Sequence, residues 1–462
     1  MYHVISQNNI RYYIVQRNWF SYMKKAFLSL LTFILTLPLM AQHQGAKFEK
    51  IDSLLTYLSV NNKFMGSLSI REKDKVVFDK AYGFADLQNK VAATPATKYK
   101  IGSITKMFTA AIIFQLIEEK KLALDTKLSE FFPKIKNADK ITIADMMDHH
   151  SGIYNYTSDS VFMSDPVKLR TRKDMTDLIY KHEPAFEPRT TAAYSNSNYL
   201  LLGYIIQDIT KKTYKENVTT RIINKIGLKN TYYYGKINPK KKEAYSYSFK
   251  DGNWALREEW HETIAGAAGG LQSTPTDLTK FATALFNGKI IKTESLAEMN
   301  KMDLGYGRGL FNFSFAERKF VGHNGDIEGF SSVVGYYAKD NMAFSLILNG
   351  ENYNFNDMVL GILSCYYKLP YRFPNFSMTA VPDSVLKSYE GIYATPTLPF
   401  SIDVKVVDGK LRIHADEQGT FYVTAISNTT FTHDAAGVVM EFTPKGFILK
   451  QSGTQTVFTK KQ

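Results

Sequence analysis

The chain has 462 residues and is 44% hydrophobic, which is enough apolar material for one large domain and a smaller one. Its 29 tyrosines and 31 phenylalanines exclude a disordered chain. The formal net charge of +13 comes without a long run of lysine and arginine, which excludes a nucleic-acid partner. A scattered basic surface is the simplest interpretation, although it would also suit anionic polymers of a cell envelope.

The first element in chain order is an N-terminal leader. Lys24 and Lys25 precede 15 residues that are nearly all apolar, and polar sequence begins after Ala41. Such a segment is typical of a secretory signal peptide, and it is shorter than the roughly 20 residues that cross a bilayer as a helix. We expect a leader over residues 1–41, with the signal peptide in 23–41, and a periplasmic or secreted mature protein without a stable membrane span. An uncleaved N-terminal anchor is the alternative.

The large domain is expected to begin with two strands and a helix. Residues 64–83 alternate as two strands around a turn at residues 73–75. Residues 103–120 carry apolar side chains at helical spacing, which predicts a strongly apolar helix. Between residues 120 and 260, helical patterns alternate with loops rich in Lys, Asp and Tyr. That stretch is therefore expected to be a mostly helical lobe.

Strands return in the second half of this domain. A capping signal with a following proline starts at Thr274 and predicts a helix that runs to Leu285. Two strands are expected at residues 330–337 and 342–349, and an apolar helix at residues 358–367.

The single cysteine, Cys365, lies in that last helix. One cysteine excludes an intramolecular disulfide, and burial as a small hydrophobic side chain is the simplest expectation. A catalytic thiol is improbable, because no histidine is close in sequence and a better nucleophile occurs elsewhere.

The composition changes where three prolines punctuate residues 370–382. We expect a large domain at residues 42–370 and a linker at residues 371–387. From residue 388 to 462, short alternating segments are separated by turns, which predicts an all-β module that forms a small barrel.

The chemistry starts at Ser103, which is followed by Lys106 in one of three S-x-x-K patterns. Only this one follows a glycine and opens a strongly apolar helix. A serine at a helix start has free backbone N–H groups nearby that can hold an oxyanion, and a lysine three residues later can reach its hydroxyl. A buried lysine can act as a neutral base. Taken alone, a serine cap beside a solvated lysine would be the simpler interpretation.

A second motif joins Tyr194 and Asn196, in the single Y-x-N of the chain. A tyrosine can pass protons between a nucleophile and a leaving group, and an asparagine two residues later can orient an amide or ester carbonyl. A loop aromatic that caps the following helix is the alternative.

A third motif, His323-Asn324-Gly325, is framed by further glycines before Phe330. Glycine is expected where an edge strand approaches a substrate closely. The next backbone N–H, that of Asp326, can then serve as an oxyanion donor.

In order and joint occurrence, these motifs resemble the serine β-lactamase and penicillin-binding protein superfamily, in its class C β-lactamase-like and DD-peptidase-like branch. The resemblance spans roughly residues 48–368. Further segments that support it are Tyr82–Asp86, Tyr99–Ser103, His149–Ile153 and Gly269–Thr274. It implies an α+β fold in which an antiparallel sheet is flanked by helices and joined to a helical lobe. The C-terminal module resembles the small lipocalin-like barrels appended to many such hydrolases, and we assign it a structural or gating role.

The resemblance also implies the roles of the site residues. The implied catalytic residues are Ser103 as nucleophile and Lys106 and Tyr194 as the proton-handling pair. The implied substrate-binding residues are Asn196, His323, Gly325 and Asp326. The backbone N–H groups of Ser103 and Asp326 would form the oxyanion hole.

One departure concerns the third motif. β-Lactamases of this branch usually carry Lys-Thr-Gly where this chain has His323-Asn324-Gly325. Because histidine titrates near neutrality, the pocket loses a permanent positive charge. Recognition of a β-lactam carboxylate is weakened, and peptidase, amidase or esterase activity is favoured.

The sequence therefore predicts a periplasmic serine hydrolase that acts through an acyl-enzyme. Expected substrates are D-amino-acid peptides derived from the cell wall or small esters, with β-lactams less favoured. A penicillin-binding sensor or scaffold with little turnover is the alternative, because it would need the same residues around the serine. No cofactor and no metal are expected, since the chain has no H-E-x-x-H, no paired-cysteine spacing and no glycine-rich phosphate loop. A G-x-S-x-G elbow is also missing, which argues against an α/β-hydrolase. The oligomeric state is left open.

Overall fold

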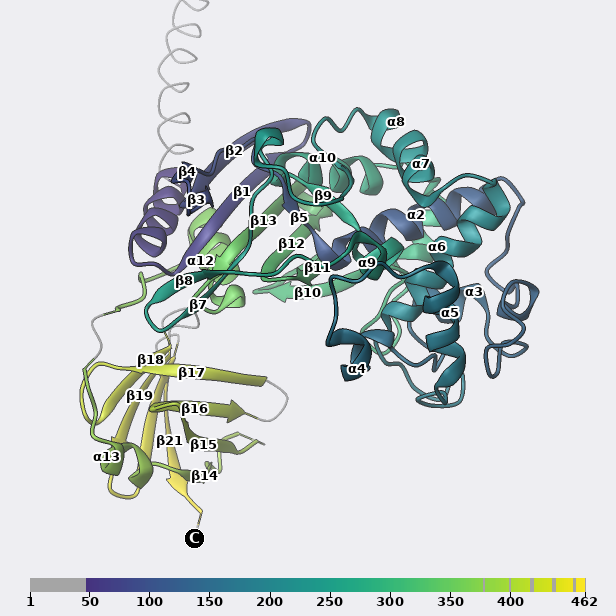
Figure 1. Cartoon of the computed structure of the whole chain (residues 1–462). Coiled ribbons are helices and arrows are strands. Elements are labelled where there is room, and N and C mark those ends of the chain that lie inside the picture. Colours follow the sequence, from purple (N-terminus) through teal and green to yellow (C-terminus); the bar gives the residue numbers. More distant parts are fainter. Residues whose placement is uncertain are drawn as a thin grey trace, which may run out of the picture.

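The computed structural model describes residues 47–376, 379–398, 400–415, 419–433, 438–451 and 454–461. The predicted leader lies outside these residues. Within them, no helix combines the length and the apolar character needed to span a bilayer. The chain forms a large α+β domain followed by a closed β-barrel (Figure 1), which confirms the predicted fold class.

The large domain is built on an antiparallel sheet with the strand order β10-β11-β12-β13-β1-β2. In that order the strands are Phe311–Phe315, Arg318–Ile327, Phe330–Tyr337, Met342–Glu351, Phe64–Glu72 and Lys75–Tyr82. A hairpin of β7 (Tyr247–Lys250) and β8 (Asn253–Leu256) adds to it, with β7 parallel to β13. The predicted hairpin at residues 64–83 and the two strands after residue 330 are confirmed.

Successive side chains along a strand point to opposite faces of the sheet, and each face packs into a separate hydrophobic core. In β13, Phe344 and Leu346 join a cluster with the helix over residues 47–60 and with α12 (Phe355–Tyr366). Ala343 and Ile347, on the opposite face of β13, join the core shared with the helical lobe. Cys365 of α12 is 1% exposed, and burial raises the pKa of its thiol to about 11, so it is the buried hydrophobic side chain that the sequence predicts.

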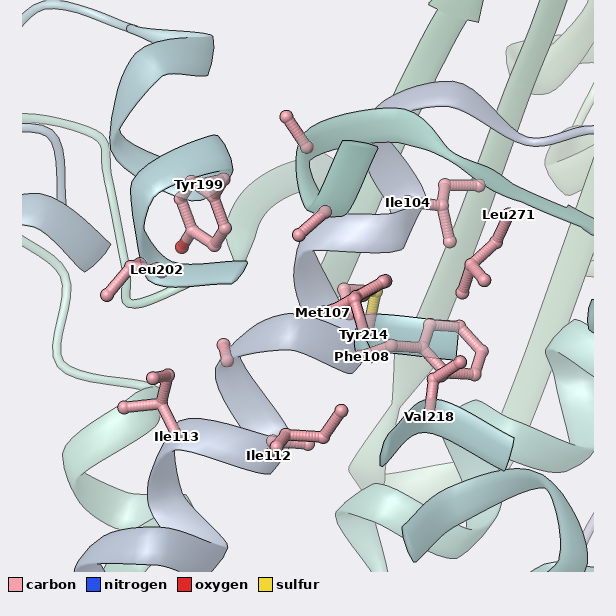
Figure 2. Packing of buried hydrophobic residues seen from close by; sticks show 14 of the residues in the cluster. Ile104, Met107, Phe108, Ile112, Ile113, Tyr199, Leu202, Tyr214, Val218 and Leu271 are labelled. Atoms are coloured by element: carbon pink, nitrogen blue, oxygen red, sulfur yellow. The ribbon is translucent and has the colours of Figure 1, made fainter. Parts of the chain in front are cut away.

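The helix that follows the predicted nucleophile, α2 (Thr105–Glu118), is buried on all sides from Thr105 to Leu116. An all-round apolar helix is typical of a domain interior. Figure 2 shows Met107 and Phe108 of α2 among Tyr214, Val218 and Leu271. Phe108 also stacks on Phe281, with ring centroids 3.7 Å apart. This packing fixes the start of α2, which directly follows the turn that carries the serine.

The regular structure between residues 120 and 260 is mostly helical, as predicted, apart from a short strand at Tyr232–Tyr233 and the β7–β8 hairpin. Its helices are α3 (Ile143–Met147), α4 (Ser160–Met163), α5 (Arg172–Lys181), α6 (Asn196–Thr210), α7 (Tyr214–Val218) and α8 (Asn224–Ile226). After it come α9 (Glu262–Gly269), α10 (Pro275–Phe286) and α11 (Thr293–Met299). The Thr274 hydroxyl accepts the N–H of Asp277 at the start of α10, which is the predicted cap. Short strands pair around the lobe: β3 (Phe84–Asp86), β4 (Val91–Ala92), β5 (Tyr99–Lys100), β6 (Tyr232–Tyr233) and β9 (Leu271–Ser273).

The C-terminal module is a closed barrel of eight strands, β14 to β21. They span Gly391–Ala394, Ile402–Val407, Lys410–Ala415, Gly419–Ala425, Thr430–His433, Val438–Thr443, Gly446–Gln451 and Thr454–Lys460. Residues 383–387, which the sequence analysis places in the linker, belong to α13 (Asp383–Ser388), because Leu386 is buried in the barrel core. His433 of the barrel lies 3.3 Å from Asp357 of α12, a contact between the two domains.

Candidate active site

The predicted nucleophile opens onto a cavity between β11 and the helical lobe. Ser103 belongs to the 3-10 turn η1 (Gly102–Ile104), which leads directly into α2. The cavity has a volume of about 610 Å³. Its lining residues come from separate stretches of the large domain: Ser103, Tyr194, Asn196, Leu304, Gly305, Tyr306, Phe311, Asn324, Gly325 and Asp326. None of these described lining residues comes from the barrel. The cavity lining therefore gives no support for the gating role that the sequence analysis assigns to the barrel.

Three predicted catalytic side chains meet at the Ser103 hydroxyl. Lys106 Nζ lies 2.9 Å from Ser103 Oγ, and the Tyr194 hydroxyl donates to the same oxygen at 2.7 Å. Ser103 and Lys106 share one face of the first helical turns, whereas Tyr194 comes from the loop before α6. The fold thus brings the Ser103–Lys106 motif and the Tyr194–Asn196 motif, which are far apart in the sequence, into contact.

Burial decides the charge of Lys106. Its side chain is 0% exposed, and burial lowers the pKa of the amine well below the usual lysine value. Its Nζ lies 2.8 Å from Asn196 Oδ1 and 2.7 Å from the carbonyl oxygen of Ala268. Carbonyl oxygens only accept hydrogen bonds, so they take both N–H groups of a neutral amine. The remaining lone pair then faces the Ser103 hydroxyl, as a general base requires.

The Tyr194 phenol keeps its proton at neutral pH. Burial raises its pKa above the usual tyrosine value, and the hydrogen bond to Ser103 offsets only part of this. The sequence left open whether Lys106 or Tyr194 takes the serine proton. The opposite pKa directions of the two groups favour Lys106 as the base and Tyr194 as a proton donor.

His149 holds Tyr194 in place, and sequence reasoning missed this contact. The rings of His149 and Tyr194 lie with centroids 4.5 Å apart, and His149 Nδ1 accepts the backbone N–H of Ser195 at 3.2 Å. Burial lowers the pKa of the imidazole well below its usual value, so the ring is neutral. The motif around His149 was visible in the sequence, but its partner was not.

Asn196 lines the cavity as predicted, and its amide is fixed on two sides. Its Oδ1 accepts from Lys106, and its Nδ2 donates to Thr157 Oγ1 at 3.0 Å. Its backbone N–H donates to Asn155 Oδ1 at 3.0 Å. These bonds leave one N–H of the amide for a substrate carbonyl.

β11 meets the serine turn through glycine. β10 pairs with β11 only as far as Gly322, so the backbone of β11 beyond it faces η1. A methyl group at Gly325 would lie 2.2 Å from the carbonyl oxygen of Ile101, and one at Gly102 would lie 2.9 Å from the nitrogen of Asp326. Gly102 also has a φ of 49°, which glycine tolerates best. The backbones that carry the two predicted oxyanion donors are therefore in contact.

Replacing Gly325 with alanine is expected to push β11 away from η1. Overpacking of this kind costs about 1–3 kcal/mol of unfolding free energy, and a shift of about 1 Å at the serine lowers kcat/KM roughly 100-fold. Thermal unfolding and kcat/KM measure the two effects. Gly235→Ala is the control, because a methyl group there meets nothing within 4 Å. Equal activity and stability of the two variants would contradict the close approach.

A buried ion pair holds η1 to the turn after β11. Lys100 Nζ lies 2.7 and 2.9 Å from the carboxylate oxygens of Glu328, and the two side chains are 1% and 0% exposed. The Tyr234 ring lies under the same ammonium, 4.4 Å from centroid to Nζ. Lys100 precedes η1 and Glu328 follows β11, so the pair connects the two segments that flank the cavity.

His323 differs from its predicted role, because its side chain is not among those that line the cavity. It is 3% exposed, its ring packs on Phe311 at a centroid distance of 4.4 Å, and its Nδ1 lies 2.5 Å from the carbonyl oxygen of Asn324. Burial lowers its pKa to about 3. The imidazole is therefore neutral at physiological pH. The sequence predicts a histidine that titrates near neutrality in place of the usual lysine, whereas the buried His323 contributes no positive charge at all.

The sequence analysis did not predict the part of the cavity lining that comes from residues 304–311. Leu304, Gly305 and Tyr306 come from a loop after α11, and Phe311 begins β10. No motif marks this stretch, since apolar and glycine residues in a loop carry no chemical signature. In the described part of the chain, no three His, Cys, Asp or Glu side chains are placed to hold a metal ion.

Comparison with known proteins gives a family match. The beta-lactamase family model matches residues 63–362. The teichoic acid D-alanine hydrolase of Staphylococcus aureus is 32% identical to the chain over 247 residues. The match includes 53% of this chain and 59% of that relative, so the chain spans little more than half the length of this curated relative.

Solved structures share the fold. The D-amino acid amidase from Ochrobactrum anthropi SV3, in complex with L-phenylalanine amide, superposes with a TM-score of 0.61 at 27% identity. The superposition covers 69% of this chain and 98% of the amidase. The octameric penicillin-binding protein homologue from Pyrococcus abyssi has a TM-score of 0.64 at 21% identity and covers 88% of this chain and 99% of its own. That likeness concerns the fold, and its extent exceeds the large domain alone.

Proposed function

Because this chain belongs to the beta-lactamase family, we propose that it is a serine hydrolase that forms an acyl-enzyme on Ser103 and cleaves amide or ester bonds of D-amino acids. One observation carries the proposal. The buried amine of Lys106 lies 2.9 Å from Ser103 Oγ and has two carbonyl acceptors for its own hydrogens. A solvated lysine beside a capping serine would have neither feature.

Acylation begins with proton transfer from Ser103 Oγ to the amine of Lys106. Oγ attacks the substrate carbonyl, and the backbone N–H groups of Ser103 and Asp326 stabilise the oxyanion that forms. When the tetrahedral intermediate collapses, the carbonyl carbon loses its bond to the leaving nitrogen or oxygen. The Tyr194 hydroxyl gives its proton to the leaving group and regains one from the ammonium of Lys106.

Deacylation repeats these steps with water. Water attacks the acyl carbon and loses a proton to the Lys106 amine. The bond between the acyl carbon and Ser103 Oγ then breaks. Oγ takes a proton from the Lys106 ammonium as the free acid departs. The sensor alternative differs only in the rate of this step.

Two relatives support D-amino-acid derivatives as the substrate class. One is named a teichoic acid D-alanine hydrolase and the other a D-amino acid amidase. The neutral His323 adds support, since a cavity without a lysine at this motif has little to hold a β-lactam carboxylate. Export to the periplasm or beyond rests on the leader pattern of the sequence, and a cell-wall-derived substrate would be met there.

Replacing Tyr194 with phenylalanine is expected to lower kcat/KM by about 10²–10⁴-fold, the usual contribution of a positioned proton donor. The loss should be larger for D-alanine p-nitroanilide than for a D-alanine p-nitrophenyl ester, because an amine leaves only with a proton. Steady-state kinetics on both substrates measure it. Tyr422→Phe, on the exposed surface of the barrel, is the control. Wild-type rates in the Tyr194 variant would remove this tyrosine from the mechanism.

The proposal is tested by intact-protein mass spectrometry after treatment with a fluorophosphonate and with D-alanine p-nitrophenyl ester. We expect one fluorophosphonate adduct on Ser103 and release of D-alanine in many turnovers. Labelling without turnover would favour the sensor, and no labelling at all would refute a reactive serine.

A further inference from the structure

The cavity contains a negative charge that the mechanism above does not use. Asn324 and Asp326 are alternate residues of β11, and both are exposed and line the cavity, whereas the intervening Gly325 is buried against η1. In the part of the chain that the structure describes, Asp326 is the single charged residue of the cavity lining. Its backbone N–H has a proposed role in the oxyanion hole, but its carboxylate has none.

The groups around the Asp326 carboxylate leave its charge uncompensated. Ser331 pairs with Asp326 across β11 and β12 and places its hydroxyl beside the carboxyl group, and the Glu351 carboxylate is near enough to interact with it electrostatically. Burial raises the pKa of Asp326, and this hydroxyl offsets part of the increase. Burial lowers the pKa of both bases behind the cavity, Lys106 and His323, which disfavours their cationic forms. When ionised, the Asp326 carboxylate is therefore the one charge in the described lining of the cavity, and it is negative.

The backbone of Asp326 lies beside the turn that carries the nucleophile, and the residue lines the cavity that the acyl part of a substrate enters. The Asp326 backbone touches Gly102, the residue before Ser103. In an amino-acid derivative, the α-nitrogen lies about 2.5 Å from the carbonyl carbon, given standard bond lengths. A carbonyl in attack position at Ser103 Oγ thus carries its α-substituent within the space that Asn324 and Asp326 line.

We propose that the Asp326 side chain is a specificity determinant that selects acyl donors with a free α-ammonium group. The carboxylate pairs with the ammonium of an aminoacyl ester or amide and disfavours donors that carry a neutral or anionic group at that position. This inference rests on the proposed function and names which D-amino-acid derivatives the site takes, namely those with an unblocked amine.

The experiment compares two acyl donors of nearly equal size. D-Alanine p-nitroanilide carries the ammonium, and D-lactoyl p-nitroanilide carries a hydroxyl in its place. We expect the wild-type chain to prefer the first in kcat/KM, and Asp326→Asn to lower the ratio of the two values by about 10- to 100-fold. The asparagine keeps the backbone N–H and the size of the side chain, so a change in this ratio reports the lost charge.

Asp303→Asn is the matched control. Asp303 precedes the lining residue Leu304, but its carboxylate is 74% exposed and lies near His150, so the variant changes net charge equally. It should leave the ratio as in wild type. The inference is overturned if wild type does not prefer the ammonium substrate, if Asp326→Asn keeps the wild-type ratio, or if Asp303→Asn changes it as much.

A second measurement separates this inference from the proposed function. D-Alaninamide and D-lactamide are compared as protectants of Ser103 against the fluorophosphonate, which needs no turnover. The inference is supported if D-alaninamide protects wild type more strongly than D-lactamide does and if Asp326→Asn removes this difference. That result would hold even if neither anilide is hydrolysed, in which case the proposed hydrolysis fails. Equal protection by the two amides overturns it, and so does a serine that the fluorophosphonate does not label.

Discussion

Replacing Ser103 with alanine is expected to lower kcat/KM for a D-alanine ester or amide by at least about 10⁴-fold, the scale at which loss of a nucleophile is seen in serine hydrolases. No other hydroxyl is in place to take over, because Tyr194 is held by Ser103 itself and keeps its proton. The alanine removes one oxygen from a turn whose backbone is fixed by the buried helix behind it, so the fold should be unchanged.

The measurements are kcat/KM, the fluorophosphonate adduct by intact mass, and thermal unfolding. Ser384→Ala is the matched control, because Ser384 and Lys387 repeat the S-x-x-K pattern on the exposed side of α13. This variant should label and turn over like wild type. A Ser103 variant that still forms the adduct would place the nucleophile elsewhere.

Replacing Lys106 with alanine should cost about 10³–10⁴-fold in kcat/KM, which is close to the loss at Ser103. The variant keeps the serine but removes the neutral amine that takes its proton. Lys106→Arg should not restore activity, since a guanidinium stays charged and cannot act as a base. Lys387→Ala, in the exposed copy of the motif, is the control.

The pH profile gives an independent check on Lys106. Because burial lowers the pKa of its amine well below the usual lysine value, the base is available near neutrality instead of only in strong alkali. Activity should fall as the pH drops through this lowered pKa, since the protonated lysine cannot accept the serine proton. Residual activity of Lys106→Ala should lack this limb in kcat/KM against pH. An acid limb that persists unchanged would assign the base to another group.

The local chemistry of this protein could be predicted from its sequence. The run after Ser103 is apolar all round, the cap at Thr274 has its proline, and the two strands after residue 330 form and pair with each other. Each of these features depends on neighbours in the chain, because hydrophobic periodicity and capping act over a few residues. The spacing of serine and lysine placed both on one face for the same reason.

The tertiary structure decided which of those residues face the cavity and which are charged. His323 was predicted to bind substrate, but it packs on Phe311 while the next residues line the cavity. The wall at residues 304–306 carries no motif, so only its position in space identifies it.

What the sequence by itself determined is the set of reactive groups and the elements that carry them. What only the tertiary structure decided is their protonation state and their partners. The pKa of the Lys106 amine is lowered because the fold buries it, and α6 and α9 contribute the oxygens of Asn196 and Ala268, which lie 90 and 162 residues away along the chain. Burial and Coulomb interactions depend on distance in space, so pKa values and cavity charge follow from packing between distant segments.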